Sequence, residues 1–154
     1  MTIARTVVGA LERNRTAFTV VHHARAMSVL DTARAARVLP EKVAKAVVLY
    51  DERGYVMAVL PGDRQVQIER LSHRLGRRLE LAHEARIAPV FEDCEVGAIP
   101  PMGNAYGMET VVDESLMGQS QIYFVAGGHE ELVCVKGAEF LKLLGEPQYG
   151  RFSQ

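Results

Sequence analysis

The sequence has few cysteines, almost no net charge and no long apolar segment. Its two cysteines, Cys94 and Cys134, lie far apart and match no metal-binding or redox spacing, so we expect buried free thiols in a reducing compartment. The formal net charge of -1 gives no general attraction to nucleic acid or anionic membranes, so any contact with nucleic acid requires a local basic patch. Because no transmembrane-length run, signal peptide or lipidation motif is present, we expect a cytoplasmic protein without membrane contact.

Several catalytic signatures are also missing. The chain contains no G-x-S-x-G motif, which excludes the usual nucleophilic serine of an α/β-hydrolase. None of its histidines is spaced as a metal-binding pair, and we predict neither a metal nor another cofactor. Cys134 lies within a predicted strand, where an inert thiol is favoured over a nucleophile.

Residues 43–50 form a short run rich in β-branched residues that is closed by a turn, and this pattern predicts a strand. Both faces of the strand are apolar, which is typical of a central strand covered on two sides. Lys45 is the single exception. It either points to water at a strand end or lies partly buried, where its charge requires an anion or a polarised carbonyl.

The length of 154 residues, without repeats or linkers, predicts one domain over residues 1–154. We predict an α+β fold with a mixed, mostly antiparallel sheet of six or seven strands and helices packed around it. Strands are expected at 18–22, 43–50, 55–60, 78–81, 110–113, 121–125 and 132–135. Helices are expected at 2–15, after Ser28, at 67–75, at 83–87 and at 137–144.

Two glycine-containing segments interrupt these elements. The first has the form G-x-x-x-P-x-G, at Gly97, Pro101 and Gly103, and is incompatible with a central strand or the interior of a helix. The second, at Gly127 and Gly128, predicts a tight turn that joins the last two strands into a hairpin.

Together with the strand lysine, these segments resemble in order and spacing the YbaK/ProX family of aminoacyl-tRNA deacylases. The same domain occurs as the editing insertion of bacterial prolyl-tRNA synthetases. The resemblance covers about residues 18–145, which we take as the core. It implies one pocket for the ester-linked aminoacyl group and the terminal adenosine of tRNA. The implied partners are the aminoacylated 3′ end of tRNA and, in addition, an aminoacyl-tRNA synthetase.

The resemblance also implies roles for individual residues. Lys45 is the essential polar group, and we expect it to act through its charge and not as a base. Because an aminoacyl ester is already activated, positioning and electrostatic stabilisation suffice, with a ribose hydroxyl of the substrate aiding the attacking water. The proline-containing loop shapes the pocket wall, and the glycine turn adds backbone N–H donors. The substrate-binding residues implied in these two segments are Gly97, Ile99, Pro101, Gly103, Gly127 and Gly128.

Four features remain open to two interpretations. His129 follows the glycine turn and either contacts the substrate or is a solvent-exposed turn histidine. His22 ends the first predicted strand and either lines the pocket or has no such role. Asp113 either faces the pocket or is a strand-end turn residue. The basic residues of segment 64–78 either hold the acceptor stem or form a solvated helix face. This basic segment contains Arg64, Arg70, His73, Arg74, Arg77 and Arg78.

Two positions depart from the family pattern. Ala46 follows the lysine where family members often carry threonine or asparagine, and Pro100 stiffens the loop beside Pro101. We predict a trans-acting editing hydrolase for tRNA mischarged with a small amino acid such as alanine or cysteine. The alternative is a non-catalytic module that binds an aminoacyl or nucleotide ligand or a synthetase.

Overall fold

The computed structural model describes residues 3–154, which form five α-helices, four short 3₁₀ turns and eight strands. The strands are β1 (Thr19–His22), β2 (Val43–Asp51), β3 (Gly54–Pro61), β4 (Glu80–Leu81), β5 (Glu109–Asp113), β6 (Gln121–Val125), β7 (Glu131–Lys136) and β8 (Gln148–Gly150). The helices are α1 (Arg5–Arg13), α2 (Val29–Ala36), α3 (Ile68–Leu75), α4 (Glu84–Ile87) and α5 (Gly137–Leu143). The 3₁₀ turns are η1 (Pro40–Lys42), η2 (Ala88–Phe91), η3 (Gly103–Tyr106) and η4 (Glu114–Leu116).

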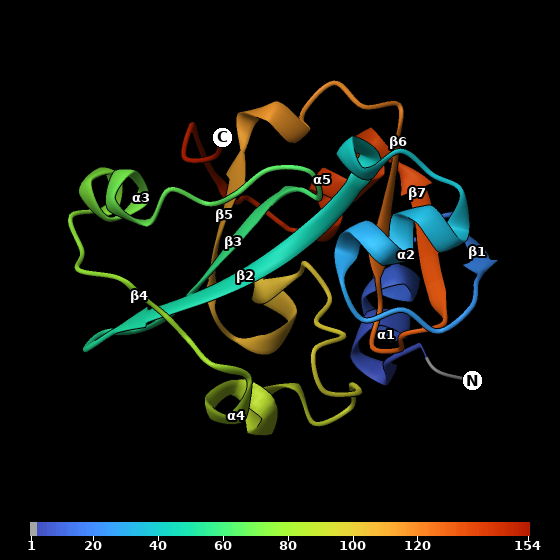
Figure 1. The fold of residues 1–154 in the computed structure, drawn as a ribbon, viewed down its shortest axis with the longest axis horizontal. Coiled ribbons are helices and arrows are strands. Elements are labelled where there is room, and N and C mark those ends of the chain that lie inside the picture. The colour runs from blue at the N-terminus through green and yellow to red at the C-terminus, as the bar shows by residue number, and fades with distance from the viewer. Residues whose placement is uncertain (1–2) are drawn as a thin grey trace.

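All eight strands belong to one mixed sheet in the order β1-β7-β6-β2-β3-β5-β8, with β4 paired to β2 outside this path. The pairings β2–β6, β3–β5 and β5–β8 are parallel, and the other four are antiparallel. In Figure 1, α3 and the C-terminus lie toward one end of the sheet, and α1, α2 and β1 lie toward the other. The predicted α+β fold with a mixed sheet is therefore confirmed, although the sheet has one strand more than predicted.

The capping signals in the sequence predicted the start of α2 and the end of α3 correctly. The Ser28 hydroxyl accepts a hydrogen bond from the Asp31 N–H (3.1 Å) and caps α2, and Gly76 ends α3 at a φ of +64°. Helix α1 is shorter than the predicted 2–15, because Ala4 is extended and its N–H donates to the Ala126 carbonyl (2.7 Å). Thr2 lies outside the described residues.

The strand that the sequence did not predict is β8, which pairs in parallel with β5. It has only three residues and follows Pro147, so no alternating pattern marks it. Tertiary contacts hold this segment in place. Phe152 is fully buried, and its N–H donates to Asp113 Oδ1 (2.8 Å). The packed core therefore extends beyond the predicted limit near residue 145.

Strand β2 lies at the centre of the sheet and is covered on both faces. On one face, Val48 belongs to a core cluster with Phe124 and Phe140. On the other, Leu49 packs in a second cluster with Phe152. The prediction of a central strand with two buried faces is thus confirmed.

The two edges of β2 differ. Along one edge, β3 pairs with it over eight consecutive residue pairs. On the other edge, β6 pairs only with Val43 and Ala44, and β4 pairs only with Leu49 and Tyr50. Residues 45–48 have no register partner on this side within the described chain. This interruption of the sheet, which we call the β2 gap, positions the candidate site.

Candidate active site in the β2 gap

A pocket of about 250 Å³ opens at the β2 gap. Its walls come from β2, from α2 and the residues before it, from the β4–α4 segment, from the loop at Gly97 and from the β6–β7 hairpin. Most lining side chains are apolar, including Val29, Leu81 and Ile99. The pocket therefore combines segments that are far apart in the sequence around the strand that carries the lysine.

Lys45 lines this pocket and is partly buried. Burial lowers the pKa of its ammonium group from the usual value, and the negative charge of Asp63 offsets only part of this effect. Within residues 3–154, no carboxylate oxygen lies within 4.0 Å of its Nζ. The pocket thus contains a cation with no carboxylate in direct contact, and an anionic or strongly polarised ligand group would match it.

His129 also lines the pocket, and only 3% of its surface is exposed. Its Nε2 lies 2.7 Å from the Val96 carbonyl oxygen. Because a carbonyl only accepts hydrogen bonds, this contact requires a proton on Nε2. The His129 backbone N–H donates to Glu95 Oε2 (2.9 Å), and Glu95 pairs with Arg25 (3.0 Å). These contacts fix the imidazole, and the interpretation of His129 as a solvent-exposed turn residue is wrong.

Gly97 forms the part of the pocket wall that lies between the side chains of Glu84 and His129. Its φ of +84° favours glycine, and an added Cβ would lie 3.1 Å from Glu84 Oε1 and 3.7 Å from His129 Cε1. Ile99 follows it along the same wall. A glycine at this position therefore brings the loop backbone close to the pocket.

The other predicted residues of the two glycine segments support the site without lining it. Gly103 packs against Thr110, where a Cβ would lie 2.5 Å from Oγ1. Gly127 has a φ of +103° and packs against Ala4, and its carbonyl accepts from the Glu95 N–H (2.8 Å). The remaining two residues, Pro101 and Gly128, are buried in the same loops.

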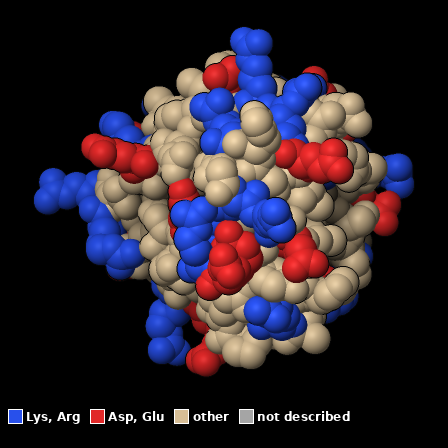
Figure 2. Space-filling view, turned by 90° about the vertical axis from the view of Figure 1, so that its left-hand side faces the viewer, with Lys and Arg blue, Asp and Glu red and all other residues tan. Residues whose placement is uncertain are grey.

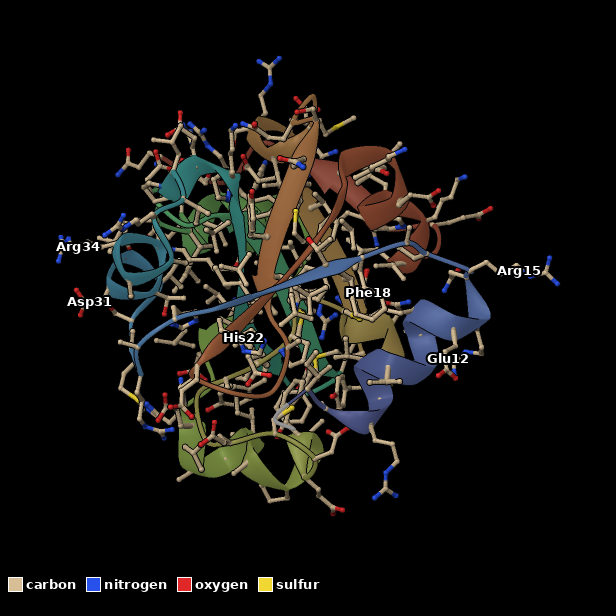
Figure 3. All side chains as sticks on the ribbon, turned by 90° about the vertical axis from the view of Figure 1, so that its right-hand side faces the viewer. Glu12, Arg15, Phe18, His22, Asp31 and Arg34 are labelled. Carbon is tan, nitrogen blue, oxygen red and sulfur yellow. The ribbon has the colours of Figure 1, made fainter. Side chains whose placement is uncertain are left out.

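The structure does not bring His22 to the pocket. His22 is exposed on β1, an edge strand of the sheet, which crosses the front of the view in Figure 3. Asp113 lies outside the pocket as well: its Oδ2 accepts from the Ser115 N–H (3.1 Å), which caps η4. Of the predicted site residues, the pocket therefore brings together Lys45, Gly97, Ile99 and His129.

Sequence reasoning missed several pocket residues. Val29 and Thr32 lie on one side of α2, and Glu84 begins α4. The capping signal at Ser28 predicted helix α2, but it did not indicate that α2 lines the pocket. Glu84 had no sequence signal at all, because the pairing of β4 with β2 brings it to the pocket.

The predicted basic patch is smaller than the sequence suggested. The Arg77 side chain is only 8% exposed and pairs with Asp51 (2.5 Å) and Glu109 (3.1 Å), and its hydrogen bonds hold the pKa of Asp51 well below the usual value. Arg64 donates to Ser153, and Arg74 donates to the Tyr149 carbonyl (2.5 Å). Figure 2 shows basic and acidic side chains interspersed on the face that carries α3. Three of the five arginines in this segment thus hold the protein's own chain together.

The two cysteines are free thiols. Cys134 is buried, and Cys94 is half-buried between Tyr106 and Asp93, where burial raises its pKa to about 11. Residues 3–154 contain no group of three or more His, Cys, Asp and Glu side chains that could hold a metal ion. No helix in the same range is both long and apolar enough to cross a membrane.

This chain belongs to the aminoacyl-tRNA editing domain family, whose model matches residues 23–143. Over 91 residues it is 33% identical to the proline–tRNA ligase of Thermosipho africanus strain TCF52B, a match that covers 58% of this chain and 16% of the ligase. The chain thus corresponds to a small part of that curated relative.

Solved structures of similar fold agree with this assignment. A protein described as a candidate trans-editing enzyme for prolyl-tRNA synthetase superposes with a TM-score of 0.83 at 21% identity, covering 97% of this chain and 96% of that one. A candidate signal-transduction protein from Marinobacter aquaeolei VT8 contains a similar region, with a TM-score of 0.75 at 21% identity over 96% of this chain and 30% of that one. At these identities, the likeness establishes the fold.

Proposed function

We propose that this protein is a trans-acting editing hydrolase that cleaves the ester bond of tRNA mischarged with a small amino acid such as alanine or cysteine. The observation that carries the proposal is the partly buried Lys45, which has no carboxylate partner and lies in a largely apolar pocket. Membership of the editing-domain family supports an aminoacyl-tRNA substrate. The similarity to a candidate trans-editing enzyme supports action on tRNA that a synthetase has released.

In the proposed reaction, water attacks the ester carbonyl carbon, the bond to the ribose oxygen breaks, and that oxygen takes up a proton. The products are the free amino acid and deacylated tRNA. The Lys45 ammonium stabilises the negative charge that develops on the carbonyl oxygen, and this effect is strengthened because the site is partly shielded from water. The ester is already activated, so the neighbouring ribose hydroxyl is sufficient to orient the attacking water.

The pocket walls favour a small side chain. Val29, Thr32 and Ile99 limit the space, and the whole pocket measures only about 250 Å³. A site of this kind separates amino acids by size, with roughly 1–3 kcal/mol for each methylene group. An amino acid that is larger than the pocket cannot enter it, so the tRNA that carries it is not hydrolysed.

A deacylation assay on a panel of mischarged tRNAs tests this proposal, comparing the wild type with Lys45→Ala and Lys45→Arg. We expect one small-residue ester to be hydrolysed and Lys45→Ala to lose about 100-fold or more in rate, since a central electrostatic contact is removed. Near-normal activity of Lys45→Arg would indicate that a positive charge alone is needed. Loss of activity in Lys45→Arg would indicate that the position of the ammonium group also matters.

Lys142→Ala is the matched control, because Lys142 is an exposed lysine on α5 outside the pocket. It should retain full activity. Background release by both the wild type and Lys45→Ala across the whole panel would contradict the proposal. That result would favour a binding module, and a ligand screen against the same pocket would follow.

A further inference from the structure

Glu84 contributes the one acidic side chain among the described residues that line the pocket, and the chemistry proposed above does not use it. Its Oε1 lies beside Gly97, at the position that an added Cβ would contact at 3.1 Å. No lysine, arginine or histidine nitrogen within residues 3–154 lies within 4.0 Å of its carboxylate. The pocket thus contains an anion and a cation, Glu84 and Lys45, that do not neutralise each other.

The backbone of Ala46 faces the same space. Residues of β2 point their N–H and C=O groups alternately to the two edges of the strand. The Val43 carbonyl accepts from Gly62 on the β3 side (2.8 Å), and the Val48 carbonyl accepts from Ala82 on the β4 side (2.9 Å). By this alternation, the N–H and C=O of Ala46 point into the β2 gap, where the described residues provide no strand partner.

We propose that the Glu84 carboxylate and the Ala46 carbonyl form a subsite for the α-ammonium group of the substrate's aminoacyl moiety. An ammonium group is a cation with three N–H donors, and the two protein groups offer a negative charge and an open acceptor. Chain connectivity supports their proximity, because Glu84 follows by two residues the last β4-side residue that is hydrogen-bonded to β2. This inference rests on the proposed function, since it names how the same pocket orients its ester.

The subsite has a consequence for the class of substrate. Glu84 binds the ammonium group while Lys45 faces the carbonyl oxygen, so the two charges hold the ester in one orientation. Glu84 is exposed, so its carboxylate stays hydrated when no ligand is bound, and an ester whose α-nitrogen is absent or acylated only loses the charged contact with it. The protein therefore acts on esters with a free α-amino group and spares N-acylated and peptidyl esters.

The test compares alanyl-tRNA with propionyl-tRNA, which has the same acyl carbon skeleton and lacks the α-amino group. Because the α-ammonium group itself activates the alanyl ester, each kcat/KM is divided by the rate of spontaneous hydrolysis of that ester. We expect this wild-type ratio to be about tenfold higher for alanyl-tRNA, the size of effect given by a charge-assisted hydrogen bond near solvent. Glu84→Gln should lose about tenfold on alanyl-tRNA and remain unchanged on propionyl-tRNA. Glu80→Gln removes an exposed carboxylate from β4 outside the pocket and should change neither value.

Equal wild-type ratios of kcat/KM to spontaneous hydrolysis for the two esters, or an equal loss on both in Glu84→Gln, would overturn the subsite and leave the hydrolase proposal intact. The wild-type comparison needs no variant, so it decides the matter even where Glu84→Gln fails to fold. Where no ester is hydrolysed, calorimetric binding of 3′-deoxy-3′-(alanylamino)adenosine and its propionylamino analogue replaces the kinetics. Preference for the amine that is lost in Glu84→Gln retains the subsite without the hydrolase, and equal or absent binding overturns it.

Discussion

The two edges of β2 show how one strand serves two purposes. On the β3 edge, eight consecutive residue pairs are formed, and the facing residues Val56, Met57, Ala58, Val59 and Leu60 are fully buried. On the opposite edge, the pairing is interrupted over residues 45–48, and Lys45, Ala46 and Val47 keep some exposed surface. The first edge satisfies its hydrogen bonds and buries its side chains. The second leaves a charge and backbone polar groups open to a ligand.

This difference suggests that stability and function are divided between the edges. A continuous ladder with a buried face contributes to folding, because its polar groups are paired and its apolar surface leaves water. An open stretch in a central strand gives up part of that contribution. It is tolerated because the neighbouring pairs with β6 and β4 anchor β2 on both sides of the gap. Variants on the two sides should therefore separate folding from activity.

Phe152→Ala tests the packing of the sheet face beneath the paired strands β2 and β3, and it has the largest expected effect on folding. Phe152 is fully buried against the sheet face that carries Leu49 and Leu60. We expect a loss of about 3–5 kcal/mol in the free energy of unfolding, because a large buried ring leaves a cavity. Urea denaturation measures this loss. Deacylation per folded molecule should stay near the wild-type value, and a large loss of activity in the folded variant would show that the division between the edges is wrong.

Gly97→Ala tests the gap side, where we expect activity to fall more than stability. A non-glycine residue at a φ of +84° costs about 1–2 kcal/mol. The new methyl group would also lie 3.1 Å from Glu84 Oε1 and so displace this carboxylate. Gly76→Ala is the matched control, because Gly76 has a φ of +64° with open space around it. Both variants should lose similar stability in denaturation, and only Gly97→Ala should lose deacylation. Equal activities would show that Gly97 matters for backbone conformation alone.

Sequence patterns predicted those parts of the fold that depend on neighbours in the chain. A run of β-branched residues closed by a turn marked β2, the serine cap marked α2, and Gly76 marked the end of α3. Lys45 stood out for the same reason, because it breaks a local pattern. Its place in the pocket followed from the resemblance to an editing-domain family, which the match over residues 23–143 confirms.

The parts that the sequence did not reveal depend on contacts between distant segments. Strand β8 has no pattern of its own and is ordered by β5 and by burial of Phe152. Glu84 reaches the pocket only because β4 pairs with β2. Arg77 belongs to a run of basic residues, yet its partners Asp51 and Glu109 lie elsewhere in the sequence. Charge along a chain therefore predicts a surface patch poorly where tertiary ion pairs form.

The smallest expected effect is on the free energy of unfolding, which the partly buried charge of Lys45 lowers. Burial lowers its pKa below the usual 10.5, so the unfolded chain binds this proton more tightly than the folded protein does. The resulting penalty is complete below the folded-state pKa, shrinks as the pH rises through it, and vanishes above the unfolded-state value. Lys45→Met should therefore abolish deacylation and stabilise the fold at neutral pH by about 0.5–1 kcal/mol, a modest gain because the side chain remains partly solvated.

Urea denaturation of the wild type and Lys45→Met at neutral pH and near pH 10.5 measures this effect against the usual lysine pKa. The stabilisation should be largest at neutral pH and should shrink at the alkaline end, because the wild-type lysine then loses its charge. Lys142→Met, which changes an exposed lysine outside the pocket, should show no such pH-dependent gain. A variant no more stable than the wild type at neutral pH, or a gain that persists unchanged at alkaline pH, would mean that the charge in the gap does not strain the fold. The open edge of β2 would then carry its lysine without loss of stability, and the division of roles between the two edges would be weaker than the geometry suggests.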